Sequence, residues 1–177
     1  MATYIGFLRA INLGATRTFP KAAIKAAVEA AGFTDVETYI NTGNVRFDTT
    51  MRSRAKIEAA LEQAFAADRG FDVPTIVFTQ RELRDIAADA ERFAEGHEGR
   101  HYVSLLKEAP TAAQVKAVED ASSAGEVAKV GGRAVHLLLG ANYHEAKLTN
   151  AAIEKHLGVA TNRNLTVISA LADRWGA

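Results

Sequence analysis

Residues 36–48 read VETYINTGNVRFD, and this stretch decides the fold of the first part of the chain. Apolar and polar residues alternate on both sides of Thr42 and Gly43, as in two antiparallel strands that each bury one face. Gly43 supplies the positive φ that a tight turn between such strands needs. The stretch therefore predicts a β-hairpin that turns at residues 42–43.

One strand and one helix are expected on each side of this hairpin. The apolar run at residues 3–8 suits a buried strand, and a helix follows that ends at Gly32. After the hairpin, Ser53 can cap a second helix that stops at Gly70, and a strand is expected over residues 71–78. Strand, helix, hairpin, helix, strand is the connectivity of a ferredoxin-like plait.

The same pattern starts again near residue 101. A strand-like run is followed by a helix that Thr111 and Gln114 begin with a capping box. The pair Gly131 and Gly132 then joins two further strands, and a helix follows at about residues 150–157. Apolar residues repeat every three or four positions up to Trp175, which predicts a closing helix in place of a last strand.

The expected fold is therefore α/β of the α+β type, with two ferredoxin-like (α/β plait) halves, the second ending in a helix. We expect an N-terminal plait-like subdomain at 1–78 and a C-terminal one, with the terminal helix, at 101–177. Residues 79–100 are expected to form a connector helix and a polar loop between them.

Composition excludes several classes of protein. The 177 residues include no cysteine, which excludes disulfides, thiol nucleophiles and iron–sulfur clusters. Apolar runs fall far short of the ~20 residues that a membrane helix requires, and the N-terminus does not resemble a signal peptide. The 21 basic and 21 acidic residues balance, which disfavours a general nucleic-acid binder. We expect a cytoplasmic protein with no membrane partner.

Several motifs carry a resemblance to a known family. They are YIGFLRAINLG at 4–14, GFTDVETYINTGNV at 32–45, KLTN at 147–150 and TNRN at 161–164. In order and spacing, the chain resembles the bacterial proteins grouped as domain-of-unknown-function family 1697. The resemblance implies a soluble two-part α/β protein and carries no cofactor or reaction. The chain departs from the family pattern at Ala10, Ala15, Ala146 and residues 165–167.

The strongest site hypothesis is a basic, polar cleft for a small phosphorylated or carboxylated ligand. Arg9 follows a strand, and Lys147 and Arg163 each lie beside an expected helix start, where unpaired N–H groups favour an anion. The cations would fix the ligand's charge, and amide and hydroxyl groups would orient it. The candidate ligand-binding residues are Arg9, Asn12, Gly14, Asn41, Asn44, Lys147, Thr149, Asn150, Arg163 and Asn164.

The alternative is that these residues bind no ligand and only stabilise the fold. Thr149 and Asn164 are good helix caps, Asn12 and Asn41 can hold loops, and Asn and Gly tolerate the left-handed backbone of a tight turn. The ligand hypothesis therefore requires the three cations to meet in space.

No catalytic residue, metal site or cofactor is indicated, and whether the protein is an enzyme stays open. His97 and His101 are four residues apart, but two nearby glycines disfavour a helix that would bring them together, and no third ligand follows. His144 is the histidine to test as an acid or base. The carboxylates of Glu58 and Glu62 are expected to face water.

Two other kinds of function stay open. Sheet edges favour strand addition, so the chain is also a candidate for self-association or partner docking without catalysis. Tyr4, Tyr39 and Phe47 lie on expected strands and suggest base stacking on RNA, which the neutral charge and the lack of an RNP1-type string disfavour. The sequence does not give the oligomeric state.

Overall fold

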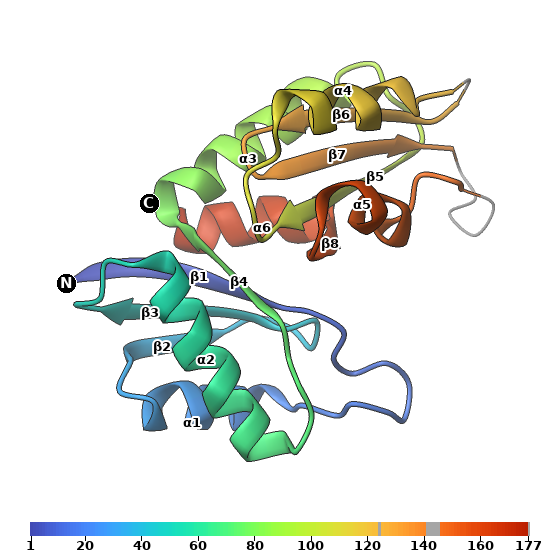
Figure 1. The fold of residues 1–177 in the computed structure, drawn as a ribbon. Helices are drawn as coiled ribbons and strands as arrows, with labels where there is room; N and C mark the ends of the chain where they lie inside the picture. Colours follow the sequence, from blue (N-terminus) through green and yellow to red (C-terminus); the bar gives the residue numbers. More distant parts are fainter. Residues whose placement is uncertain (124, 141–145, 177) are drawn as a thin grey trace. The chain divides into compact units, whose positions relative to one another are not determined.

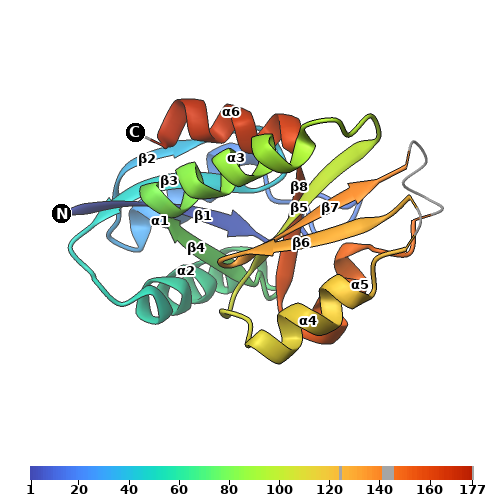
Figure 2. The same cartoon turned by 90° about the horizontal axis from the view of Figure 1, so that it is seen from above.

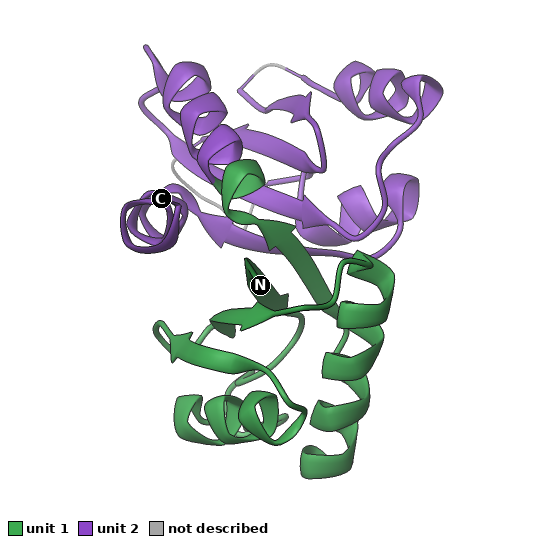
Figure 3. Ribbon diagram, turned by 90° about the vertical axis from the view of Figure 1, so that its left-hand side faces the viewer, with its two compact units in different colours: residues 1–83 green, residues 84–177 purple. Residues whose placement is uncertain are grey.

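The computed structural model describes residues 1–123, 125–140 and 146–176 (Figure 1). The chain folds into two compact units, Met1–Leu83 and Arg84–Ala177 (Figure 3). Among the described residues, none of the helices has the length and apolar character needed to cross a membrane.

Unit 1 is a ferredoxin-like plait, as predicted. The sheet order is β2-β3-β1-β4 and every neighbouring pair is antiparallel. The elements are β1 (Ala2–Leu8), α1 (Lys21–Ala30), β2 (Thr34–Thr38), β3 (Asn44–Thr49), α2 (Arg54–Arg69) and β4 (Thr75–Thr79). The predicted hairpin is β2 and β3, with Gly43 in the turn at a φ of 86°.

The core of unit 1 lies between its sheet and its two helices. Alternation along β1 and β3 places Tyr4, Leu8 and Phe47 on one face of the sheet, where they join a buried cluster. The helices add residues at helical spacing, such as Ile24 of α1 and Leu61 of α2. Burial of this apolar surface is the main stabilising contribution to unit 1.

Unit 2 repeats the plait. Its sheet order, β6-β7-β5-β8, follows the same connectivity, and all its pairs are antiparallel. The helix α3 (Gln80–Ala94) runs into this unit from the end of unit 1. The other elements are β5 (Arg100–Leu106), α4 (Ala112–Asp120), β6 (Val127–Gly131), β7 (Ala134–Leu139), α5 (Asn150–Leu157), β8 (Ala160–Asn164) and α6 (Leu165–Trp175).

The expectation that a helix replaces the last strand of unit 2 was wrong. The strand β8 is present beside β5, and α6 follows it. The sequence of β8, ATNRN, has one apolar residue, so periodicity gives no strand signal there. Thr161 and Arg163 lie on one face of β8 and are both buried, although both are polar. The strand pairs with β5, which lies far from it in the sequence.

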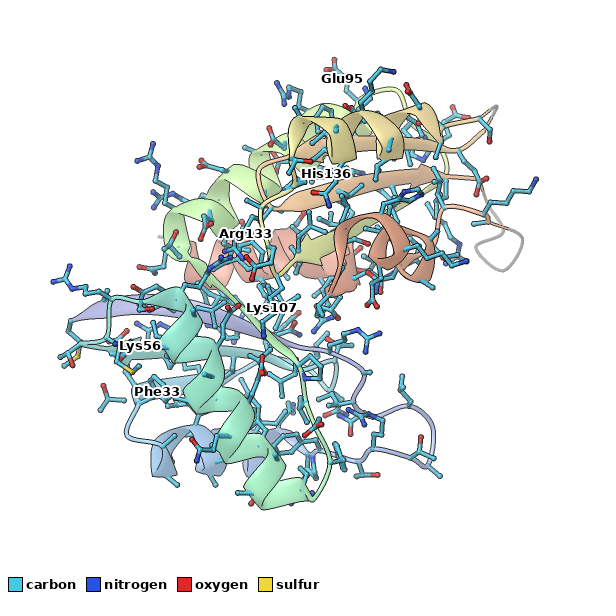
Figure 4. The ribbon with its side chains drawn as sticks, viewed as in Figure 1. Phe33, Lys56, Glu95, Lys107, Arg133 and His136 are labelled. Atoms are coloured by element: carbon cyan, nitrogen blue, oxygen red, sulfur yellow. The ribbon has the colours of Figure 1, made fainter. Side chains whose placement is uncertain are left out.

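Helices cover both faces of the unit 2 sheet (Figure 2). On one face, α4 and α5 pack on a cluster that includes Leu106 and Leu137. The other face is covered by α6, which contacts β5 and β8, and by α3, whose Phe93 ring lies 5.0 Å from that of His136. Figure 4 shows His136 on β7. The register places Val103, Arg163 and Lys129 on this second face with His136.

Candidate functional site

Five of the predicted ligand-binding residues lie at one end of the unit 1 sheet, four of them in loops and Asn44 at the start of β3. Asn12 makes the contacts that join these loops. Its Nδ2 donates to the carbonyl oxygen of Asn41 at 2.7 Å and to that of Phe19 at 3.0 Å, and its Oδ1 accepts from the Phe19 N–H at 2.7 Å. The five residues are Arg9, Asn12, Gly14, Asn41 and Asn44.

Asn44 and Gly43 close the hairpin turn. Asn44 is buried, and its Nδ2 donates to the Tyr39 carbonyl oxygen at 3.0 Å and to Thr42 Oγ1 at 2.8 Å. A Cβ on Gly43 would lie 2.8 Å from the Leu8 Cβ, and its φ is positive. Both positions are therefore explained by the turn itself, which leaves Asn41 as the exposed amide of this loop.

Arg17 is a contributor that the sequence did not reveal. Its guanidinium donates to the carbonyl oxygens of Ala10 and Asp72, and lies 4.6 Å from the centre of the Phe71 ring. It thus fastens the β1–α1 loop to the connection between α2 and β4. An arginine in a loop gives no sequence signal for such contacts, because its partners are backbone carbonyls.

The backbone of these loops is held in an unusual conformation. Four non-glycine residues have positive φ, between 49° and 60°: Ala10, Asn12, Arg17 and Ile40. Each such residue costs about 1 to 3 kcal/mol, and β-branched Ile40 is a true outlier. The contacts of Asn12 and Arg17 maintain this backbone. The helix α1 begins nearby at Lys21. Its N-cap residue, Pro20, makes no side-chain hydrogen bond, so the first N–H groups of the helix have no side-chain acceptor from that position.

In unit 2, three predicted residues have roles in the fold. Thr149 caps α5 by accepting from the Ala152 N–H, and Asn164 caps α6 by accepting from the Val167 N–H. Asn150 joins α5 to the sheet, because its Oδ1 accepts from Ser104 Oγ at 2.9 Å and its Nδ2 donates to the Ala160 carbonyl oxygen at 2.8 Å. The caps made by Thr149 and Asn164 are those that the alternative interpretation predicts, whereas Asn150 serves the fold through contacts to the sheet and not as a cap.

The two cations of unit 2 differ in exposure, because Lys147 is exposed whereas Arg163 is buried. The Lys147 N–H donates to Glu126 Oε1 at 2.6 Å, and Leu148 beside it packs in the cluster under α4 and α5. Arg163 lies on the face of the sheet that carries His136, and its Nη1 donates to Thr161 Oγ1 at 2.9 Å and to the Asn162 carbonyl oxygen at 2.8 Å. Burial lowers the pKa of Arg163 to about 10, so it stays charged at neutral pH.

Two buried histidines form a pair that the sequence did not predict. His101 Nε2 and His136 Nδ1 are 3.3 Å apart, whereas His101 Nδ1 and His136 Nε2 have no hydrogen-bond partner. Burial, with a smaller effect of His97 on His101 and of His101 and Arg92 on His136, lowers the pKa of each ring to about 4. Within the part of the chain that the structure describes, no group of three or more residues could hold a metal ion. His144 lies outside the described residues.

The expectation that Glu58 faces water was wrong. Glu58 is 3% exposed, and its Oε2 accepts from the N–H of Val77 at 3.0 Å. Glu62 Oε1 accepts from the N–H of Thr75 at 3.2 Å, one turn further along α2. Both glutamates therefore bind the outward N–H groups of β4, the edge strand of unit 1.

The fold and these sites define an α+β protein of two ferredoxin-like plaits, with polar loops at one end of the first sheet. The chain belongs to the family described as protein of unknown function (DUF1697), whose model matches residues 1–136. A solved structure, that of the conserved bacterial protein SP0830 from Streptococcus pneumoniae, is similar with a TM-score of 0.76 and 20% sequence identity. The match covers 100% of this chain and 99% of that one and shows the shared fold. Among curated proteins, none matches.

Proposed function

We propose that this protein binds a small anionic ligand, phosphorylated or carboxylated, at the unit 1 loops around Arg9. The observation that carries the proposal is the network of Asn12, which joins the β1–α1 and β2–β3 loops and supports a backbone with four non-glycine residues at positive φ. Such costly conformations are concentrated at binding and active sites.

The roles that we propose for the five residues agree with their contacts and exposure. Asn12 and Asn44 use their amides within the loops, so they position the site. Arg9 follows β1, with its N–H held by the Pro74 carbonyl oxygen at 2.9 Å, and it supplies positive charge for a phosphate or carboxylate. Asn41 and Gly14 are exposed and offer an amide and an open backbone to the ligand.

The start of α1 adds to the same chemistry. Phe19, whose N–H is bound by Asn12, directly precedes Pro20 at the helix N-cap. No acidic residue lies in the first turn of α1 to offset the positive end of the helix dipole. In unit 2, by contrast, Thr149, Asn150 and Asn164 are engaged in the fold, so the proposal depends on Arg9.

Replacing Arg9 with alanine is expected to weaken the binding of inorganic phosphate by about tenfold or more, because a charge-assisted hydrogen bond is lost. Isothermal titration calorimetry at constant ionic strength measures this effect, with acetate as the probe for a carboxylate. Arg52→Ala is the matched control: it removes an exposed arginine just after β3, at the other end of the same sheet. If Arg9→Ala and Arg52→Ala bind both probes as the wild type does, the proposal is wrong.

A further inference from the structure

The two edge strands of the unit 2 sheet, β8 and β6, differ in whether side chains cover their backbone. At β8, the Ala160 N–H donates to Glu154 Oε1 at 3.4 Å, and the Ala160 carbonyl oxygen accepts from Asn150 at 2.8 Å. The Arg163 guanidinium donates to the Asn162 carbonyl oxygen of the same strand. A strand of another molecule would have to displace these side chains to pair with β8.

The other edge strand, β6, has an open segment at Val130. The Ala128 N–H donates to Ser122 Oγ at 3.0 Å, so it points away from β7. Because alternate residues of a strand direct their backbone groups to the same side, the N–H and carbonyl of Val130 also point outward. Val130 is partly exposed, and no other described residue bonds to either group. It therefore offers one donor and one acceptor to an added strand.

The backbone of β6 is also more regular than that of β2, an edge strand of unit 1. The strand β6 pairs with β7 without a shift in register from Val127 to Gly131. In β2 the register shifts between Thr34 and Glu37, and Asp35 has a φ of 50°. Such a bulge twists an edge and interrupts pairing. Carboxylates bind the outward N–H groups of β4, the other edge of unit 1. Among the described edges, β6 is thus the regular one with an open segment.

A cation lies beside this open segment. Lys129 Nζ is 5.0 Å from the centre of the Phe93 ring, and no carboxylate of the described residues pairs with it. Arg92 lies 4.8 Å from the same ring, and Asp89 pairs with Arg92 at 2.8 Å. These three charged groups therefore leave a net positive charge on this face of β6. On the other face, the side chain of Val130 packs against the apolar cluster of unit 2.

We propose that the β6 edge binds an extended, acidic segment of another protein as an added strand. The backbone of the segment exchanges hydrogen bonds with Val130, as in β-augmentation. Because side chains alternate between faces, acidic residues of the segment lie beside Lys129 and apolar residues beside Val130. A second copy of this chain fits less well. Two β6 strands paired at Val130 would place their lysines about 7 to 8 Å apart on one face. This surface does not depend on the proposed site at Arg9.

Titration of the ¹⁵N-labelled full chain with a short, end-capped peptide of alternating glutamate and valine tests the proposal. We expect saturating shifts of the β6 amide signals, and an affinity that falls as salt is added. Val130→Pro removes the outward N–H at a position where an edge strand tolerates proline. We expect this variant to weaken the binding by about tenfold, followed at the Gly131 amide.

Lys129→Glu tests the charge and leaves the backbone unchanged. We expect it to weaken the binding of the glutamate peptide by about tenfold or more, and to favour a matching peptide of lysine and valine. Lys155→Glu is the matched control, because it makes the same change in charge at an exposed position on α5. It is expected to bind the glutamate peptide as the wild type does, apart from the small effect of net charge.

Four results would overturn the proposal. The first is the absence of saturating shifts in β6 with the glutamate peptide, and the second is equal binding of the glutamate and lysine peptides by the wild type. The third is equal affinity of Lys129→Glu and Lys155→Glu for the glutamate peptide. The fourth is a shift of the β6 signals when the chain alone is diluted, because a second copy would then occupy this edge.

Discussion

Replacing Glu58 with alanine is expected to lower the free energy of unfolding of unit 1 by about 3 kcal/mol. The carboxylate of Glu58 accepts from the Val77 N–H, and both residues are buried. Alanine leaves that N–H without an acceptor in a site that water does not reach easily. A hydrogen bond to a charged group contributes about 1.5 to 3 kcal/mol, and the orphaned donor adds to the cost.

Amide hydrogen exchange measures this effect at the residue concerned. The Val77 amide is expected to exchange about a hundredfold faster in Glu58→Ala, and urea unfolding followed by circular dichroism should show the same loss of stability. Glu58→Gln keeps an oxygen acceptor and should lose less than half as much. Glu29→Ala, which removes an exposed glutamate from α1, is the control. Exchange at Val77 that is equal in Glu58→Ala and the wild type would contradict the prediction.

The role of Glu58 also concerns self-association. Three outward N–H groups of the edge strand β4 are bound by carboxylates: Val77 by Glu58, Thr75 by Glu62, and Thr79 by Glu82 at 2.8 Å. A strand of another molecule could not bind these donors without displacing the glutamates. The glutamates therefore oppose strand addition at this edge, which is one of the alternatives that the sequence left open. Glu58→Ala is the variant that would make the Val77 N–H available to a strand of another molecule.

Unit 2 uses a related arrangement. Glu154 Oε1 accepts from the N–H of Ala160 at 3.4 Å, and Asn150 donates to the carbonyl oxygen of the same residue. Asn150 and Glu154 are four residues apart on α5, as Glu58 and Glu62 are on α2. In both plaits, the second helix thus binds the backbone of the edge strand that follows it.

The elements of the fold were predictable where local signals agreed. The alternation at residues 36–48, the capping box at Thr111 and the glycines after α2 and α5 each act within a few residues, and the structure confirms them. The strand β8 was missed because a short polar strand is defined by its partner β5, which the chain reaches from far away.

The side-chain sites were harder to predict for a related reason. Glu58 follows Ile57 on α2, and its position beside the apolar stripe was the one signal that it turns toward the sheet. His101 and His136 are 35 residues apart, and no spacing rule links them. The sequence motifs drew attention to the loop residues around Asn12, but the contacts that each of them makes depend on the tertiary structure.

Because of the buried pair His101 and His136, we expect the free energy of unfolding to fall steeply in acid. The pKa of both rings is lowered from 6.5 to about 4 in the folded chain. Between these values the unfolded chain binds more protons than the folded one, so the free energy of unfolding decreases as the pH falls from about 6.5 to about 4. Each ring contributes at most about 1.4 kcal/mol per pH unit.

Neighbouring charges do not reverse this direction. The groups near the pair on the same face are mostly cationic, and the acid among them, Asp89, is paired with Arg92 at 2.8 Å. A proton on either ring would therefore add positive charge to a positive, buried environment. The groups are Asp89 and Arg92 on α3, His97 before β5, Lys129 on β6 and Arg163 on β8.

Urea unfolding at a series of pH values measures the effect, with the fluorescence of Trp175 as the probe of unit 2. The double variant His101→Gln and His136→Gln is expected to flatten the dependence of stability on pH between about 4 and 6.5, whatever its stability near neutral pH. His156→Gln, at an exposed position on α5, should keep the wild-type slope. The slope of stability against pH reports proton binding rather than packing. If the double variant has the wild-type slope, other groups take up the protons on unfolding, and the histidine pair does not cause the loss of stability in acid.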